Sequence, residues 1–233
     1  MTLADSCYAR IRQDIVTGAL APGEPLKMDL LKEKYGMGFS PLREALNRLQ
    51  SDRLVTLVSA KGFRVSPVSL VEMWDTIQTR ILIETDALKR SMRFGDDKWE
   101  VNIVSCLHAL SLQATRMANL NHSLSNDEAL ALEERHSAFH KALIAGCQSQ
   151  WMLIFAEKLY VDTERYRFPV LMNHGISNER NLNEEHTRLA NAVTTRNELE
   201  ATEILKNHLM RTGETLEKNF ETIFKPIPLV ESA

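Results

Sequence analysis

The sequence predicts a mainly α-helical protein, in which a winged helix-turn-helix precedes an all-α helical bundle. Three observations support this prediction. A turn, a proline-started helix and a β-hairpin signal follow one another within residues 1–67. Beyond residue 68, apolar residues recur at helical spacing and no strand signal stands out. Aromatic residues make up only 6% of the chain, and the apolar residues are mostly Leu, Ile, Val, Ala and Met, which suits helices better than sheets.

The first part of the chain, residues 1–67, is expected to begin with three helices. Apolar residues at helical spacing predict the first one, and they are Tyr8, Ile11 and Ile15. A turn over residues 21–24 leads to a short second helix that ends at Gly36. Ser40 is the expected N-cap of the third helix, with Pro41 at its first helical position. The inward stripe of this helix is Leu42, Leu46 and Leu49.

Two short β-prone runs follow the third helix. They cover residues 55–58 and 63–65, and the residues between them include Lys61 and Gly62, which is the pattern of a hairpin. Three helices and a hairpin in this order predict a winged helix-turn-helix DNA-binding domain over residues 1–67. Residues 68–233 are then expected to form a second, all-helical domain.

Six helices are expected in the second domain, over about residues 69–93, 97–119, 125–147, 149–168, 179–196 and 198–224. Capping boxes at Ser69–Glu72 and Ser125–Glu128 predict two of the starts. Pro169 is expected to stop the fourth helix, before an irregular stretch over residues 172–177. Pro226 and Pro228 should close the last helix.

Charge and composition narrow the function further. The net charge is −3, but residues 1–67 hold 10 Lys and Arg against 7 Asp and Glu, and residues 68–233 hold 18 against 24. A basic first domain on an acidic second one fits DNA binding through one end. The three cysteines lie far apart, so we expect free thiols in a reducing cytoplasm. We find neither a signal peptide nor a run of about 18 apolar residues, so no membrane partner is expected.

The start of the third helix is the expected DNA-reading element, because the second helix of a helix-turn-helix enters the major groove with its N-terminal end. The predicted DNA-binding residues lie there and in the hairpin: Gly38, Phe39, Ser40, Pro41, Arg43, Lys61 and Gly62. The helix dipole disfavours a cation at Arg43, so this residue is expected to contact a guanine or a phosphate. Glu44 and Arg48, four residues apart, are expected to pair on the helix surface. An ordinary solvated face is the alternative reading.

Four of the seven histidines fall on apolar stripes of predicted helices: His136, His140, His186 and His208. His136 and His140 are four residues apart, a spacing that can hold one metal ion. Four imidazoles inside an apolar bundle each need a partner, which favours a divalent metal site. Two alternatives remain open, namely histidines whose polar groups are satisfied within the core and direct binding of an anionic effector by the imidazoles.

Residues 5–67 resemble the winged-helix domain of the GntR family of bacterial transcription factors, on the run from Pro41 to Leu46 (PLREAL). The remainder resembles the effector domain of the FadR branch, of the type called FCD. Two positions depart from the family pattern. Phe39 stands where an Arg usually precedes the Ser/Thr-Pro pair, and an Arg common in the preceding helix falls near Asp29. Two expected phosphate contacts are therefore missing, so the operator sequence cannot be carried over.

The resemblance implies a ligand-responsive transcriptional regulator, most often a repressor, and not an enzyme. It implies a homodimer on a pseudo-palindromic operator in double-stranded DNA. It also implies a divalent metal, which many FCD-type domains hold with an Asp and a His four residues apart and two further histidines. In this chain His136 stands in the place of the Asp, so the site would be all-nitrogen, and zinc or nickel is the expected metal.

The resemblance further implies a small carboxylate effector. Arg80 and Glu84 lie on the inner stripe of the first bundle helix, where the family often carries an Arg-x-x-x-Glu beside the pocket. Arg80 is therefore expected to clamp the carboxylate, unless the two charges simply neutralise each other. Arg165 is a further effector-binding candidate, together with its neighbours Tyr166 and Arg167.

Two other functions remain as alternatives. One is a regulator that responds to the metal itself, without an organic effector. The other is a metal-dependent hydrolase, because an open metal position can activate water. Glu133 and Glu134 are the nearest candidates for its general base, but neither shares the histidine stripe well.

Overall fold

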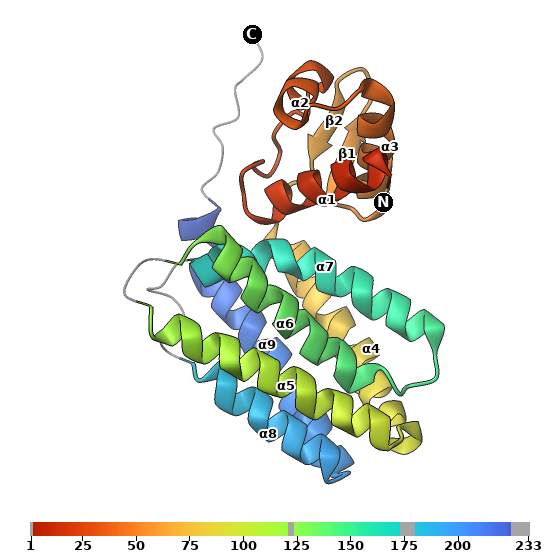
Figure 1. Cartoon of the computed structure of the whole chain (residues 1–233), viewed down its shortest axis with the longest axis vertical. Coiled ribbons are helices and arrows are strands. Elements are labelled where there is room, and N and C mark those ends of the chain that lie inside the picture. Colours follow the sequence, from red (N-terminus) through yellow and green to blue (C-terminus); the bar gives the residue numbers. More distant parts are fainter. Residues whose placement is uncertain (1, 121–123, 173–179, 225–233) are drawn as a thin grey trace.

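A computed structural model of the chain describes residues 2–120, 124–172 and 180–224. Within these residues it contains nine helices and one two-stranded sheet. Figure 1 shows the first three helices and the hairpin at one end of an elongated molecule, with the other six helices side by side at the other end. We call the first group (α1–α3, β1 and β2) the head and the second (α4–α9) the bundle. The expected stretch over residues 172–177 and the prolines at 226 and 228 fall mostly or wholly outside the described residues.

The head contains α1 (Leu3–Val16), α2 (Met28–Tyr35), α3 (Phe39–Ser51), β1 (Val55–Val58) and β2 (Gly62–Val65). Thr2 and Asp5 form a capping box at the start of α1, which the sequence analysis did not anticipate. Gly36 ends α2, as predicted, and adopts the left-handed conformation at φ 67°. The three helices and the sheet enclose a core of their own, to which Ile11, Leu46 and Leu54 contribute fully buried side chains. The winged helix-turn-helix is confirmed.

The start of α3 differs from the prediction, which was wrong about its cap. The N-cap is Gly38 and the helix begins at Phe39, so Ser40 lies inside the first turn. Pro41 is tolerated there because the first N–H groups of a helix have no helical partner, and the first bond in α3 runs from Leu42 N to Gly38 O at 3.3 Å. The left-handed turn at Gly36 reverses the chain early enough for the helix to begin one residue before the serine.

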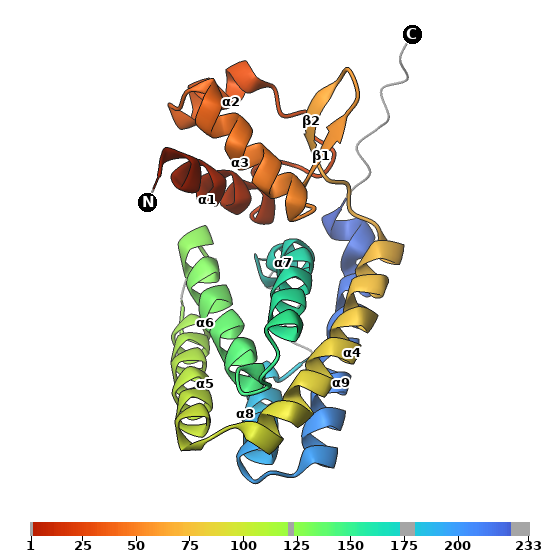
Figure 2. The ribbon, with the colours of Figure 1, turned by 90° about the vertical axis from the view of Figure 1, so that its right-hand side faces the viewer.

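The hairpin is the wing of the head. β1 and β2 pair antiparallel, with Val55 opposite Val65 and Val58 opposite Gly62. Residues 23–26 add a short third run against β2, in which Leu26 N donates to Phe63 O at 2.8 Å. Figure 2 shows the tip of the hairpin pointing away from the bundle.

The bundle contains α4 (Leu70–Phe94), α5 (Asp97–Ala118), α6 (Asn126–Ile144), α7 (Gln150–Met172), α8 (Leu182–Thr194) and α9 (Glu198–Ile223). Ser69 caps α4, and Ser125 forms the predicted capping box with Glu128 at the start of α6. The bundle encloses a continuous apolar core, in which Leu88, Phe139 and Val193 are fully buried. No helix among the described residues is long and apolar enough to cross a membrane.

Pro169 does not stop α7, contrary to the prediction. The helix continues to Met172, with the proline inside its last turn. Pro169 has no N–H to donate to the carbonyl four residues earlier, so the last turn lacks one helical hydrogen bond. The residues on either side of it hold the turn, since Phe168 is buried against Val16 and Val170 packs near Tyr166.

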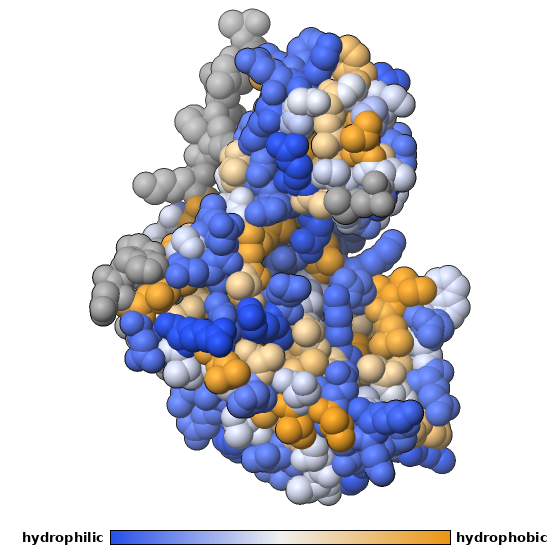
Figure 3. Space-filling model, in the orientation of Figure 1, coloured by the Kyte–Doolittle hydropathy of each residue, from blue (hydrophilic) through white to orange (hydrophobic). Residues whose placement is uncertain are grey.

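Helix α7 also joins the bundle to the head. Arg12 of α1 forms an ion pair with Glu164. Arg165 donates from Nη1 to the backbone oxygen of Ser66 at 3.2 Å, at the connection between head and bundle. Apolar contacts accompany these bonds, and the hydrophobic side chains at this junction are visible on the face in Figure 3.

Candidate metal centre and effector pocket

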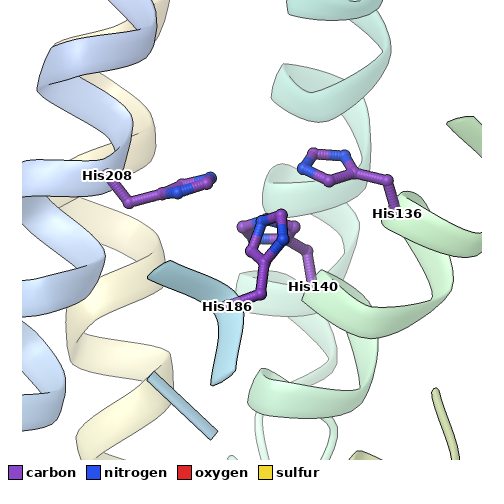
Figure 4. A group of neighbouring side chains, drawn as sticks. All are labelled: His136, His140, His186 and His208. Carbon is purple, nitrogen blue, oxygen red and sulfur yellow. The ribbon is translucent and has the colours of Figure 1, made fainter. Parts of the chain in front are cut away.

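The four predicted histidines meet in the middle of the bundle, although they come from three helices. Helix α6 supplies His136 and His140, α8 supplies His186 and α9 supplies His208, and Figure 4 shows the four side chains directed towards one another. One ligand atom from each of them lies within 4.8 Å of the others. The ring centroids of His136 and His140 are 4.5 Å apart, and those of His186 and His208 are 4.8 Å apart. The residues thus converge on one point.

Several of these ring nitrogens lack a hydrogen-bond partner. Both nitrogens of His140 and Nε2 of His186 are buried without one. Burial lowers the pKa of all four imidazoles, so at neutral pH they are uncharged and have lone pairs to offer. Buried polar atoms are normally bonded, so unpaired imidazole nitrogens that converge on one point fit a bound metal ion.

A hydrogen-bonded chain orients His136. Its Nδ1 lies 2.8 Å from the hydroxyl of Tyr160, and that hydroxyl donates to Glu133 Oε1 at 2.8 Å. With its proton directed to Glu133, the hydroxyl can accept from Nδ1 of His136, and in that tautomer Nε2 keeps its lone pair. Arg167 forms an ion pair with the same carboxylate. Burial opposes the charge of Arg167, yet Glu133 and Tyr160 hold the pKa of this guanidinium above its ordinary value.

A carboxylate orients His208 in the same way. Nδ1 of His208 lies 3.1 Å from Glu185 Oε2. Arg180 binds Glu185 through Nε and Nη2, and Nη2 also donates to the backbone oxygen of His208 at 2.8 Å. Partial burial disfavours the charge of Glu185, but the hydrogen bonds from His208 and Arg180 hold the pKa of this carboxyl well below its usual range. The ionised carboxylate accepts from Nδ1, so Nε2 of His208 is again free for a metal.

A cavity of about 380 Å³ opens beside the cluster. His136, His186 and His208 line it, and apolar side chains such as Leu132 and Leu216 form much of its wall. The polar and charged residues around it are Glu133, Arg167, Arg180, Asn183, Thr212, Thr215, Lys218 and Asn219. An apolar pocket with a few convergent polar groups is the usual form of a small-molecule site.

Sequence reasoning missed part of this pocket. Arg180 precedes α8, although the predicted helix starts at about residue 179, and only its closeness to Glu185 in the chain hints at its place. Glu133 was judged to lie off the histidine stripe, yet it is buried in the pocket wall. Its ion pair with Arg167 occupies the carboxylate, which leaves it poorly placed to act as a general base.

The predicted effector residues lie elsewhere. Arg80 is fully buried and is not among the residues that line the 380 Å³ cavity. Its Nε donates to Glu84 Oε1 at 2.6 Å and its Nη1 to Thr163 Oγ1 at 2.9 Å, while Nη2 has no partner. Glu84 lines a second cavity, of about 240 Å³, which His140 also lines.

Arg165 lies at the junction with the head and outside both cavities. It contacts the Ser66 carbonyl and, at 3.6 Å, the carboxylate of Glu72. Its neighbours in α7 project to other sides of the helix. Arg165 thus contacts the connection between head and bundle, and its part in effector binding stays a prediction.

The predicted DNA-binding residues lie at the start of α3 and around the hairpin turn. Gly38, Phe39, Ser40 and Arg43 are exposed, and Pro41 is half-buried. Arg43 makes no hydrogen bond or ion pair with any residue that the structure describes, so its guanidinium is available. Lys61 and Gly62 are exposed at the hairpin.

The expected pair of Glu44 and Arg48 is wrong. Arg48 instead donates from Nη1 to Asp5 Oδ1 at 2.8 Å, and its guanidinium lies 4.5 Å from the ring centroid of Tyr8. These contacts tie α3 to α1, because helix packing brings α1 closer to Arg48 than its own neighbour one turn earlier. Arg48 is thus used within the head, in contrast to Arg43.

Comparison with known families assigns both parts of the chain. The model for bacterial regulatory proteins of the gntR family matches residues 3–65, and the model for the FCD domain matches residues 75–211. The chain is 37% identical over 208 residues to the uncharacterized HTH-type transcriptional regulator BphR of Paraburkholderia xenovorans (strain LB400), which covers 89% of this chain and 82% of BphR. It is 33% identical to the HTH-type transcriptional repressor GlaR of Escherichia coli (strain K12), over 97% of this chain and 94% of GlaR.

Two solved structures share the fold over 94% of this chain and 99% of their own. Escherichia coli McbR/YncC superposes with a TM-score of 0.75 at 18% identity. A putative transcriptional regulator GntR from Rhodococcus sp. RHA1 superposes with a TM-score of 0.71 at 15% identity. The arrangement of head and bundle is therefore one that solved structures already contain.

Proposed function

Because this chain belongs to the gntR family of bacterial regulatory proteins, in its FadR-type form with an FCD domain, we propose that it is a metal-dependent repressor that responds to a small carboxylate. Its standing as a DNA-binding transcriptional regulator, and not an enzyme, follows from the family. GlaR and RspR, both of Escherichia coli (strain K12), are named as repressors, which supports the sign of regulation. The observation that carries the proposal is the convergence of four buried imidazoles beside a cavity of small-molecule size.

The metal would be held by His136, His140, His186 and His208. An all-imidazole set suits zinc, nickel or copper better than magnesium or manganese, which prefer oxygen ligands. Four ligands complete the usual tetrahedral shell of zinc, whereas nickel accepts further ligands. If the effector binds the metal directly, the donor set therefore favours nickel. The bound ion would supply a positive charge, and an ion such as nickel, which accepts further ligands, would also offer an open position for a carboxylate oxygen.

The effector would lie in the 380 Å³ cavity. Four neutral imidazoles leave the double charge of a divalent ion uncompensated, which favours an anion there. Arg167 and Arg180 face the same cavity, although each is already paired with a carboxylate. These two residues replace Arg80 as our first candidates for orienting the effector. Arg80 lies outside this cavity, and its Nη2 is buried without a hydrogen-bond partner.

DNA would be bound by the head of each protomer in a homodimer, since one winged helix reads one half-site of a pseudo-palindromic operator. The residues involved would be those at the start of α3 and in the hairpin. We keep the division between the DNA-binding and effector domains at residues 67 and 68, in the interval between the two matched ranges. The connection there is held by Arg165 and Glu72, so effector binding in the bundle can reach the head through it.

Thermal unfolding of the full chain tests the sensor proposal. The protein is loaded with Ni²⁺ or Zn²⁺, screened against a panel of small mono- and dicarboxylates, and screened again after chelation. A ligand at 100 times its Kd adds about 2.7 kcal/mol, which corresponds to roughly 5–10 °C for a chain of this size. We expect one acid to raise the Tm only when the metal is present.

Matched variants identify the site in the same assay. His140→Ala should abolish the metal-dependent shift, whereas His108→Ala, at an exposed position on α5, should leave it unchanged. A large stabilisation by metal with no response to any acid would favour a regulator that responds to the metal itself. Stabilisation by an acid in chelated protein would instead show that the imidazoles bind the anion directly.

A further inference from the structure

Phe39 is an exposed aromatic side chain that contributes little to the core of the head. It is the first residue of α3, and 47% of it is exposed. The leucines of the same helix, Leu42, Leu46 and Leu49, are all fully buried. An aromatic residue this exposed gains little from the core, so its place at the DNA-facing end of the head calls for another reason.

The surroundings of Phe39 hold its ring at the end of the helix. Lys32 of α2 lies against the ring, with Nζ 5.0 Å from the ring centroid. This contact places a cation on one side of the ring and restrains the side chain. One turn further along α3, Arg43 is exposed and has no partner among the described residues. The end of the helix thus presents an apolar ring beside a free guanidinium.

These two groups read different features of DNA. In the major groove a guanine offers two acceptors to an arginine, and the apolar feature of a base edge is the 5-methyl group of thymine. A phenyl ring neither donates nor accepts a hydrogen bond, so contact with that methyl group is the readout available to it. On the family assignment and the DNA-binding role given above, we propose that Phe39 recognises a thymine methyl group in each half-site of the operator.

The helix geometry also limits where this thymine lies. Phe39 and Arg43 are separated by four residues, which is about 6 Å along a helix axis. Base pairs are spaced about 3.4 Å apart. The thymine that Phe39 contacts therefore lies within about two base pairs of the base that Arg43 contacts.

The test begins with selection of binding sites from random duplex DNA by the full-length protein. Wild-type protein and the variants Phe39→Ala and Arg43→Ala are selected in parallel. We expect the wild-type site to contain a thymine near the position whose preference Arg43→Ala removes. In the Phe39→Ala selection that thymine preference should be lost while the position read by Arg43 is kept.

Removal of the single methyl group then tests the contact directly. Deoxyuridine replaces the thymine in the selected duplex, and affinity is measured by fluorescence anisotropy at fixed salt. The loss of one buried methyl group predicts about fourfold weaker binding for wild-type protein. Phe39→Ala should bind the two duplexes equally. A second pair of duplexes, with cytosine or 5-methylcytosine at that position, should show the same methyl dependence in wild-type protein alone.

The controls separate this inference from the DNA-binding function. Leu3→Ala, which removes an exposed apolar side chain of α1 in the same head, should leave the effect of deoxyuridine unchanged. Equal binding of thymine and deoxyuridine duplexes by wild-type protein at every position would overturn the role of Phe39, as would an undiminished effect in Phe39→Ala. If wild-type protein selects no sequence at all, the DNA-binding function itself fails.

Discussion

At the scale of single residues, the hydrogen bonds to the outer ring nitrogens orient two of the four histidines. Tyr160 and Glu185 each bind one ring nitrogen and so direct the other towards the centre of the cluster. His140 has no such partner, and both of its nitrogens are buried and unpaired. Hydrogen bonds therefore orient His136 and His208, whereas the metal itself would fix the orientation of His140.

Tyr160→Phe tests this arrangement. The change removes the hydroxyl that accepts from His136 and donates to Glu133, and leaves the ring in place. We expect metal affinity to fall by about 10–100-fold, as measured by competition with a chromophoric chelator. Tyr8→Phe is the matched control, because it removes a comparable hydroxyl bond to Asp52 in the head. Equal loss in both variants would point to general destabilisation.

Asp5 should make the head sensitive to acid. Hydrogen bonds from the Thr2 backbone and from Arg48 lower the pKa of Asp5 to about 2 in the folded protein, from 3.8. A group with a lowered pKa stabilises the fold above its unfolded pKa, and this stability is lost as the pH falls through the folded value. Asp5→Asn should therefore lower the unfolding temperature at pH 7, and the difference from wild-type protein should shrink between pH 4 and pH 2. A difference independent of pH would contradict the ionised cap.

At the scale of elements, α7 contacts both the histidine cluster and the head. Tyr160 and Arg167 face the histidines and the pocket, whereas Glu164 and Arg165 contact the head and the connection to it. These residues alternate within two turns of one helix. A rotation or shift of α7 that accompanies ligand binding would thus change the contacts of both ends of the molecule at once.

Glu164→Gln should weaken the coupling between effector and operator. It removes the ion pair with Arg12 but lies outside the pocket, so metal and effector should bind as before. We expect the coupling free energy, from operator affinities with and without effector, to change by about 0.5–2 kcal/mol. The control is Glu157→Gln, also on α7. It removes an exposed ion pair with Lys141 of α6 and should leave the coupling intact. Unchanged coupling in Glu164→Gln would rule out this contact as a route.

The packing of α4 against α9 depends on one glycine. A Cβ atom at Gly213 would lie 2.5 Å from the ring of Trp74. Alanine favours helices over glycine by about 1 kcal/mol, but the overlap should reverse the sign. We expect Gly213→Ala to lower the free energy of unfolding by about 1–3 kcal/mol, measured by urea denaturation. The double variant with Trp74→Leu should recover part of the loss, and an additive result would show that the contact is not responsible.

At the scale of the whole molecule, charge and function are separated along its length. The net positive part of the sequence is the head, which carries the exposed end of α3 and the hairpin, and the net negative part is the bundle, which contains the histidine cluster and the cavity beside it. The acidic bundle, with its cavity, therefore lies at the end of the molecule away from the DNA-reading end of the head. Two heads in a homodimer would then address two half-sites together.

The length of the operator tests the homodimer. Once the selected site is known, a duplex with both half-sites is compared with one that has a single half-site and the same total length. Two linked contacts should bind tighter by about 10²–10⁴-fold, measured at one salt concentration because DNA affinity depends on salt. Sedimentation of the free protein should give twice the mass of one chain. Equal affinity for the two duplexes would mean that a single head acts alone.

Local patterns in the sequence were enough to predict the helices, the hairpin and the four inward-facing histidines, because these features depend on residue spacing, capping residues and turn residues. Predictions from local rules were wrong where another contact competed. Gly38 caps α3 in place of Ser40, and α7 continues past Pro169. Arg48 pairs with Asp5 of α1 and not with its neighbour Glu44. Periodicity shows which face of a helix is apolar but does not show how helices cross.

The packing of the helices, in contrast, sets which buried charges share a pocket. It joined Glu133 and Arg167 to the histidines, added Arg180 from outside any helix, and left Arg80 and Arg165 out of the cavity. These residues lie on different helices or far apart in the chain. Their distances depend on the packing of whole helices, which no local pattern in the sequence specifies.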